Sequence, residues 1–250
     1  MRNLLALLLL LTPAWAGKVY TDGTFDSVSW EEVVLRNDNN GVTYFAQQEL
    51  SGGNPGAHWS VGSGIPSVPV GTNNGVVVAF LNPAFTWDPA ADGLIASMQF
   101  SFDLKSFSST GYNPAFGGFF RPVIRQDGTV YSLTTDFREA PADWTQFDFA
   151  LTPGSPWTSF GGSLTPDFTV NGGQIEFGFR VNMGGNCSGA SGNCSEASLI
   201  SGLDNYSARI AGVSEPGPGG EIPEPGTVAL MGAGLLGLFA ARRQLNQRRS

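Results

Sequence analysis

Histidine and cysteine are scarce in this chain of 250 residues, which has one histidine and two cysteines. A Ser-His-Asp triad would have to use His58, and no G-x-S-x-G motif is present, so serine-hydrolase chemistry is not expected. One histidine and two cysteines also supply too few ligands for the usual zinc sites. The sequence therefore assigns no catalytic residue.

Basic residues are scarce between residues 17 and 222, where 8 Lys and Arg stand against 20 Asp and Glu, a net charge of −12. Nucleic-acid binding needs a basic footprint, so nucleic acid is not an expected partner. An acidic surface keeps a protein soluble and also suits hard cations such as Ca²⁺. Both interpretations of the charge stay open.

Long apolar stretches with a helical period are missing from the same region. Short runs with alternating or continuous apolar residues recur between Gly- and Pro-rich turns instead, and this is typical of strands. The expected strands are 28–36, 42–50, 75–81, 94–104, 119–125, 129–135, 144–151, 174–182 and 203–210. The sequence predicts an all-β, jelly-roll-like β-sandwich over residues 17–212.

Strand alternation also predicts the core. Within 94–104, one face carries Met98, Phe100, Phe102 and Leu104. Within 174–182, one face carries Ile175, Phe177, Phe179 and Val181. Successive side chains of a strand point to opposite faces, so these two apolar sets are expected inside the sandwich.

The N-terminus has every element of a secretory signal peptide. Arg2 gives a positive start, residues 4–11 are apolar, and Ala14-Trp15-Ala16 forms an A-x-A cleavage site. Residues 1–16 are therefore predicted to be a signal peptide, and the mature chain to begin at Gly17.

The C-terminus predicts a single transmembrane helix. A Gly- and Pro-rich linker, 213–222, precedes an uncharged apolar run at 227–241. As a helix this run measures about 22 Å, short of a bilayer core of about 30 Å. The stop-transfer residues would be Arg242, Arg243, Arg248 and Arg249, which stay cytoplasmic under the positive-inside rule. A buried core helix is the alternative.

The motif before this run carries a family resemblance. Pro223-Glu224-Pro225-Gly226, the apolar run and the terminal arginines resemble, over residues 223–250, the PEP-CTERM sorting signal of Gram-negative bacteria. The resemblance implies export through the inner membrane, processing by an exosortase near the motif, and sorting of the body to the cell surface or the extracellular space. It implies nothing about the fold of the body.

Cys187 and Cys194 flank a short loop. In an exported protein such an isolated pair is expected to form a disulfide rather than two free thiols.

A second resemblance is confined to short segments. Residues 51–57, with Gly-Asn-Pro-Gly, and residues 203–210, with Asp-Asn-Tyr, resemble jelly-roll carbohydrate-binding and laminin-B-like domains. Such modules use a structural calcium ion. Asp22, Asp26 and Asp204 are the candidate ligands, because first and last strands commonly pair; turn or capping roles are the alternative.

Tryptophans in Pro-containing loops suggest a sugar-binding surface. Trp87 and Trp157 are the candidates for stacking on sugar rings, and burial in the core is the alternative. Glu31, Glu32, Glu49 and Glu176 could instead supply the paired carboxylates of a glycosidase, although no spacing selects a pair.

The sequence thus predicts a non-enzymatic, surface-sorted protein that binds or builds the extracellular polysaccharide matrix. A carbohydrate-active hydrolase and a plain anchored surface protein without a sugar ligand are the alternatives.

Overall fold

A computed structural model describes residues 17–38, 40–110, 118–187 and 193–213. The signal peptide, the sorting motif, the transmembrane run with its arginines, and the linker apart from Val213 lie outside the described residues. Val213, predicted as the first linker residue, belongs to the last strand. No helix among the described residues is long and apolar enough to cross a membrane.

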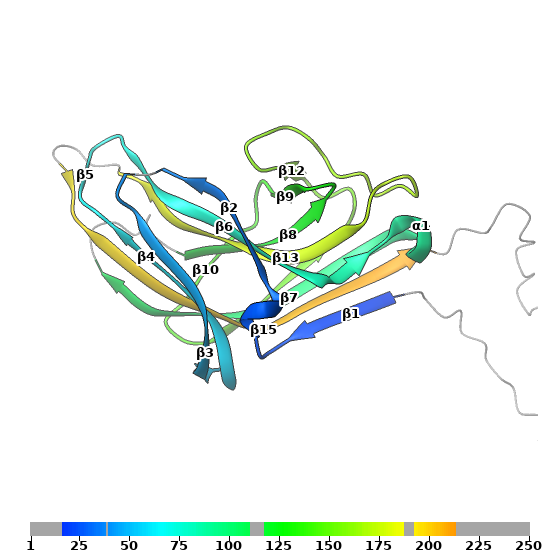
Figure 1. Cartoon of the computed structure of the whole chain (residues 1–250), viewed down its shortest axis with the longest axis horizontal. Coiled ribbons are helices and arrows are strands. Elements are labelled where there is room, and N and C mark those ends of the chain that lie inside the picture. The colour runs from blue at the N-terminus through cyan, green and yellow to red at the C-terminus, as the bar shows by residue number, and fades with distance from the viewer. Residues whose placement is uncertain (1–16, 39, 111–117, 188–192, 214–250) are drawn as a thin grey trace, which may run out of the picture. The chain divides into compact units, whose positions relative to one another are not determined.

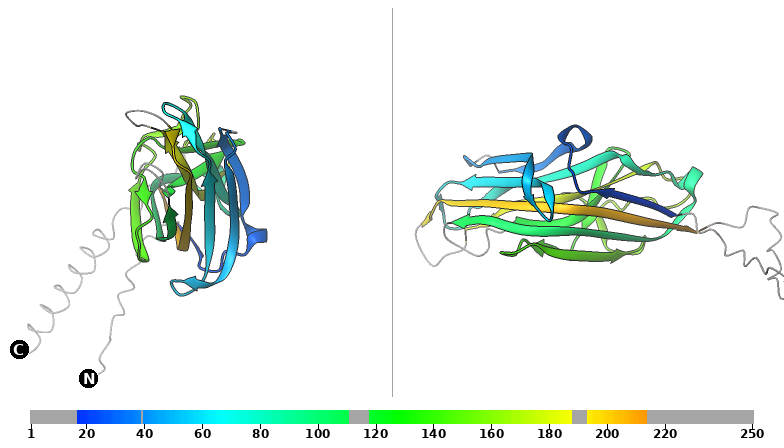
Figure 2. Two further views of the ribbon diagram at one scale, coloured as in Figure 1. Left: turned by 90° about the vertical axis from the view of Figure 1, so that its left-hand side faces the viewer. Right: turned by 90° about the horizontal axis from the view of Figure 1, so that it is seen from below.

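The body is a sandwich of two antiparallel sheets, seen end-on in the left panel of Figure 2. The six-stranded sheet has the order β11 (Thr145–Leu151), β7 (Leu94–Thr110), β15 (Ala197–Val213), β4 (Gly56–Ile65) and β3 (Thr43–Gly53), and β1 (Gly17–Asp22) also pairs with β15. In Figure 1, β15 and β1 run side by side along one edge of the molecule.

The seven-stranded sheet has the order β12 (Trp157–Ser159), β9 (Thr129–Leu133), β8 (Gly118–Gln126), β13 (Ile175–Asn186), β6 (Asn73–Trp87) and β2 (Glu31–Asn37), and β10 (Arg138–Glu139) also pairs with β8. Two short strands, β5 (Val68–Pro69) and β14 (Asn193–Cys194), form a separate ladder, and the helical elements are η1 (Ser27–Ser29) and α1 (Pro89–Asp92). The prediction of a two-sheet β-sandwich is confirmed.

The core lies between the sheets, and both predicted apolar faces contribute to it. All eight side chains named for β7 and β13 are at most 1% exposed. The run 76–81 of β6 is buried on both faces, as a continuous apolar strand requires. The first predicted strand starts at Glu31 rather than at residue 28, because Asp26 caps the short helix η1 instead.

Cys187 and Cys194 form the predicted disulfide, with a sequence separation of 7. The bridge is buried with Val68 and joins Cys194, the last residue of β14, to the residue that follows β13. A loop this short adds about 2–3 kcal/mol to the free energy of unfolding by the chain-entropy estimate.

Candidate functional site

The face of the six-stranded sheet that points away from the core carries polar side chains, with a few exposed aromatic rings among them. Because strand side chains alternate, burial of Leu203 and Trp59 in the core places Gly202, Asp204 and His58 on the outer face. The right panel of Figure 2 looks onto this sheet, with β15 running along its middle. We call the row of outer side chains beside β15 the polar stripe.

A groove of about 260 Å³ forms one end of the polar stripe. Strands β7, β11 and β15 line it with the amide, hydroxyl and charged groups of Gln99, Ser101, Gln146, Asp148, Ser207 and Arg209. These strands are hydrogen-bonded neighbours in the sheet, so a rigid scaffold fixes the groups. Both hydrogen-bond donors and acceptors are available to a ligand here.

An aromatic cluster lies next along the stripe and consists of His58, Phe107 and Trp144. The Phe107 ring centroid lies 4.9 Å from that of His58 and 5.7 Å from that of Trp144. The rings meet over Gly202, where an added Cβ would lie 2.7 Å from Phe107 Cε2. The missing side chain therefore lets the rings lie close to the sheet, while Phe107 stays 41% exposed.

Beyond the aromatic cluster, glycine again makes room for an aromatic ring. Phe45 on β3 is 40% exposed, and its ring occupies the space above Gly62 of β4. A second groove of about 530 Å³ follows at the end of the sheet, lined among others by Thr43, Gly64 and Ser198.

Two buried carboxylates, Asp103 and Asp204, lie opposite each other between the first groove and the aromatic cluster. Asp103 Oδ2 accepts hydrogen bonds from Asn54 Nδ2 at 3.0 Å and Asn205 Nδ2 at 2.7 Å. Asp204 accepts from the backbone N–H groups of Asn54 and Asn205. Burial, with Asp103 nearby, raises the pKa of Asp204 above its usual value.

We expect Asp103→Asn to stabilise the folded protein at neutral pH. Because the pKa of Asp204 is raised on folding, this group contributes fully to the free energy of unfolding below its unfolded-state pKa of about 4. That contribution is lost as pH rises through the raised pKa of the folded state. Asparagine keeps an acceptor for both amides but removes one charge, so urea denaturation should show a gain of about 1 kcal/mol near pH 7 and almost none near pH 3. Exposed Asp148→Asn is the control, and an equal loss of stability at both pH values would contradict the expectation.

His58 packs into the aromatic cluster. It is 4% exposed, and burial lowers its pKa despite the nearby carboxylates of Asp204 and Glu49. The ring centroid of His58 lies 4.9 Å from that of Phe107 and 5.6 Å from that of Trp144.

The polar stripe runs from Ser198 to Arg209, roughly 35 Å at about 3.3 Å per strand residue. Along it, one groove with amides and hydroxyls and a second groove with hydroxyls flank exposed flat rings. Hydroxyl-rich ligands need both kinds of contact, because their hydroxyl groups require hydrogen bonds and their C–H faces pack on aromatic rings. The length suits a chain of linked units.

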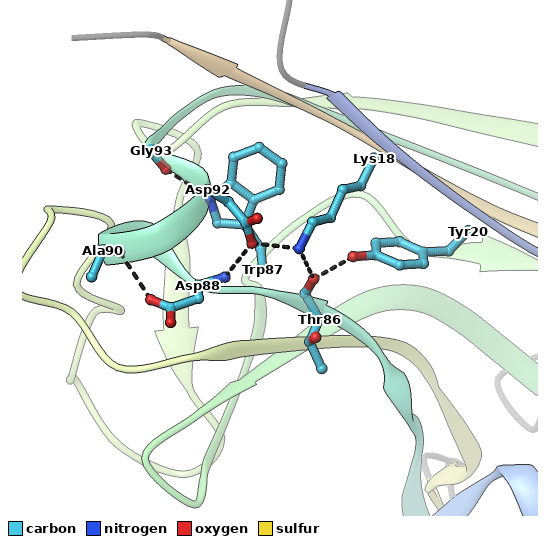
Figure 3. Close-up of polar contacts among 8 residues, drawn as sticks. All are labelled: Lys18, Tyr20, Thr86, Trp87, Asp88, Ala90, Asp92 and Gly93. Atoms are coloured by element: carbon cyan, nitrogen blue, oxygen red, sulfur yellow. Dashed lines mark hydrogen bonds and ion pairs between the residues drawn. The ribbon is translucent and has the colours of Figure 1, made fainter.

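The tryptophans proposed for stacking are not part of this face. Trp87 is 1% exposed, because it ends β6 against α1, where its Nε1 donates to the Gly93 carbonyl at 2.8 Å (Figure 3). Lys18 Nζ lies 5.6 Å from the Trp87 ring centroid and bonds to Asp92. Trp157 is 3% exposed and donates to the Thr152 carbonyl. The prediction that these rings are exposed is wrong.

The three aspartates proposed for calcium are not brought together. No cluster of three or more His, Cys, Asp or Glu suited to a metal occurs in the ranges that the structure describes. The Asp22 carboxylate accepts hydrogen bonds from Thr24, Phe25 and Trp30. Burial alone would raise the pKa of Asp22, but these hydrogen bonds have the larger combined effect and lower it. Asp26 caps η1. The turn and capping roles apply to both, and the predicted ligand set is wrong.

Of the four glutamates proposed for a glycosidase, two converge, but on a cation. Arg125 binds Glu31 at 2.6 Å and also Glu176, so one guanidinium holds both carboxylates in ion pairs. Glu32 accepts from the Tyr44 hydroxyl, and Glu49 accepts from Gln47.

The sequence reasoning missed the aromatic cluster and the grooves. One signal was available, since Gly62 and Gly64 recur two residues apart beside apolar Val61 and Ile65. Small residues on one face of a strand leave space for a partner to approach.

The body is similar to solved structures, and the tail matches a family model. The body is similar in structure to a family 11 carbohydrate-binding module from Clostridium thermocellum (13% identity, 80% of this chain and 97% of that chain, TM-score 0.43). It is also similar to the CBM22-1 xylan-binding domain from Paenibacillus barcinonensis (10%, 80% and 99%, 0.36) and to the K1 cleaved adhesin domain of Lys-gingipain from Porphyromonas gingivalis (10%, 79% and 99%, 0.35). No curated protein sequence matches the chain.

The tail is matched by sequence. Residues 221–244 match the family model of the PEP-CTERM protein-sorting motif, which confirms the resemblance seen in Pro223-Glu224-Pro225. The chain is therefore a β-sandwich protein that carries a C-terminal PEP-CTERM protein-sorting motif.

Proposed function

We propose that this is an exported protein whose sandwich binds polysaccharide along the outer face of the six-stranded sheet, as a binding or structural component of the extracellular matrix. The observation that carries the proposal is the polar stripe, in which two grooves flank exposed aromatic rings on one continuous sheet face. Aromatic rings over a rigid sheet stack on sugars at little cost in conformational entropy.

Binding without cleavage agrees with the chemistry of the grooves. Each groove is lined by a single carboxylate among the described residues, Asp148 in one and Glu196 in the other. Glycoside hydrolysis needs two carboxyl groups flanking the bond to be cut. Asp103 and Asp204 are adjacent, but both are buried under hydrogen bonds from Asn54 and Asn205.

The test is binding of the full-length protein to a panel of polysaccharides, with reducing-end release measured in the same samples. We expect saturable binding to at least one neutral polysaccharide and no release of reducing ends. Binding to none of them would favour the plain surface protein, and release of reducing ends would favour the hydrolase.

The tail proposal has its own test, the intact mass of the surface form. An exosortase that cuts near Pro223-Glu224-Pro225 leaves a product without Arg242 and the arginines beyond it. A surface product that retains Arg248 and Arg249 would instead make the tail a simple anchor in the inner membrane.

A further inference from the structure

The outer face of the seven-stranded sheet carries a cluster of three arginines, Arg36, Arg121 and Arg180. Arg180 on β13 pairs directly with Arg121 on β8, and Arg36 on β2 pairs with Val77 of the intervening strand β6. Their strand neighbours Phe179 and Phe120 are buried in the core, so the arginine side chains lie on the other face. Like charges directly opposite in a sheet are destabilising.

Arg36 Nε lies 3.4 Å from Asp38 Oδ1, but no acid among the described residues forms an ion pair with Arg121 or Arg180. Arg121 is 8% exposed and donates from Nη1 to the Leu133 carbonyl at 2.7 Å, while its Nε has no hydrogen-bond partner. Arg180 has no ion pair or hydrogen bond within the ranges that the structure describes, and it lies 5.3 Å from the Phe160 ring centroid. Burial, with Arg121 and Arg36 nearby, lowers the pKa of Arg180 to about 9.

Another arginine on the same sheet does bind acidic side chains. Arg125 on β8 faces Glu176 on β13 and binds both Glu176 and Glu31. Four residues along β8, Arg121 faces a second arginine instead of an acid. In a body with 20 acidic and 8 basic residues, the two facing arginines Arg121 and Arg180 have no ion pair among the described residues, which leaves room for an external anion.

We propose that the arginine cluster is a second ligand site, which binds the carboxylate groups of an acidic polysaccharide built from hexuronic acids. Guanidinium groups bind carboxylates in a bidentate, charge-assisted geometry. Asn182 follows Arg180 by two residues on the same face, and its covered Oδ1 also lacks a partner, so it can accept from a ligand hydroxyl if the side chain turns outward. Phe137, 49% exposed and 5.5 Å from the Arg121 guanidinium, adds a flat apolar contact. A ligand with carboxylates, hydroxyls and apolar ring faces fits better than free phosphate or sulfate, which lack the last two.

The experiment is calorimetric titration of polygalacturonate, with neutral galactan as the reference, into the full-length protein at low ionic strength. We expect Arg180→Gln to weaken polygalacturonate binding about tenfold, the effect of losing one hydrogen bond to a charged group. Lys18→Gln removes one positive charge from β1 of the other sheet, outside both grooves, and should change the affinity less than about twofold. Because Arg180→Gln also removes like-charge repulsion, its Tm should not fall, which separates lost binding from unfolding.

Polygalacturonate should also raise the Tm of the unmodified protein while galactan does not, and this readout needs no variant. Three results would each overturn the assignment. These are no effect of polygalacturonate on the unmodified protein, equal weakening of binding by both variants, and binding of dextran sulfate as tightly as polygalacturonate. The arginine cluster and the polar stripe lie on different sheets. Phe107→Ala should therefore leave polygalacturonate binding intact, whether or not the polar stripe binds a neutral polysaccharide.

Discussion

Trp30→Ala is expected to lower the free energy of unfolding by about 3–5 kcal/mol. Trp30 lies between the sheets, 6% exposed, with ring centroids 5.3 Å from both Phe179 and Tyr206. Its Nε1 also donates to Asp22 Oδ2 at 2.8 Å, so truncation leaves that carboxylate short of a donor. Since domains are stable by only about 5–15 kcal/mol, the variant should be close to unfolding at moderate urea concentrations.

The matched control is Trp30→Phe, which keeps a ring in the core but loses the indole donor. It should cost about 1–2 kcal/mol, mainly from the lost hydrogen bond and the smaller ring. Urea denaturation followed by circular dichroism measures both variants. A loss below about 1 kcal/mol for Trp30→Ala would mean that this ring is not at the centre of the sandwich.

Phe107→Ala is expected to weaken binding of a neutral polysaccharide about tenfold or more, while leaving the fold intact. Phe107 is the most exposed ring of the aromatic cluster, and Lys105 Nζ lies 5.4 Å from its centroid. A ring already 41% exposed contributes little to the core, so a large effect on affinity with a small change in Tm would show that it contacts the ligand.

Phe137→Ala is the matched control, because Phe137 is 49% exposed but belongs to the face of the other sheet. It should leave the affinity for the neutral polysaccharide unchanged. Equal loss with both variants would mean that exposed phenylalanines bind the polymer nonspecifically, and no loss with either would remove the aromatic cluster from the site.

The local pattern of the sequence predicted the strands whose apolar residues alternate or run continuously, including β6, β7 and β13. It missed β4, because the outer positions of this strand hold Gly62 and Gly64 and show no alternation of apolar and polar side chains. The same glycines create space on the outer face, so the feature that hid the strand also belongs to the site.

The local sequence pattern could not predict whether the tryptophans are buried or exposed. Pro-rich neighbours suggested exposed loops for Trp87 and Trp157, yet long-range packing buries both, Trp87 under Lys18 from the first strand (Figure 3). Asp204 was expected to meet Asp22 because β1 and β15 pair, and they do pair, but the carboxylate of Asp22 turns to its own loop. The hydrogen-bond partner of a side chain depends on tertiary contacts, and the alternation of apolar and polar residues does not predict these contacts.

Binding of polysaccharide on the outer face of the six-stranded sheet can be located by NMR titration of the full-length protein. Side-chain amide signals of Gln99 and Gln146 report on the groove, whereas Gln126, 2% exposed and bonded to Asp167 and Gly173, reports on the other sheet. We expect a neutral oligosaccharide to shift the first two signals in a saturable way and to leave the Gln126 signal unchanged. Shifts confined to the seven-stranded sheet, with Gln99 and Gln146 unmoved, would contradict it.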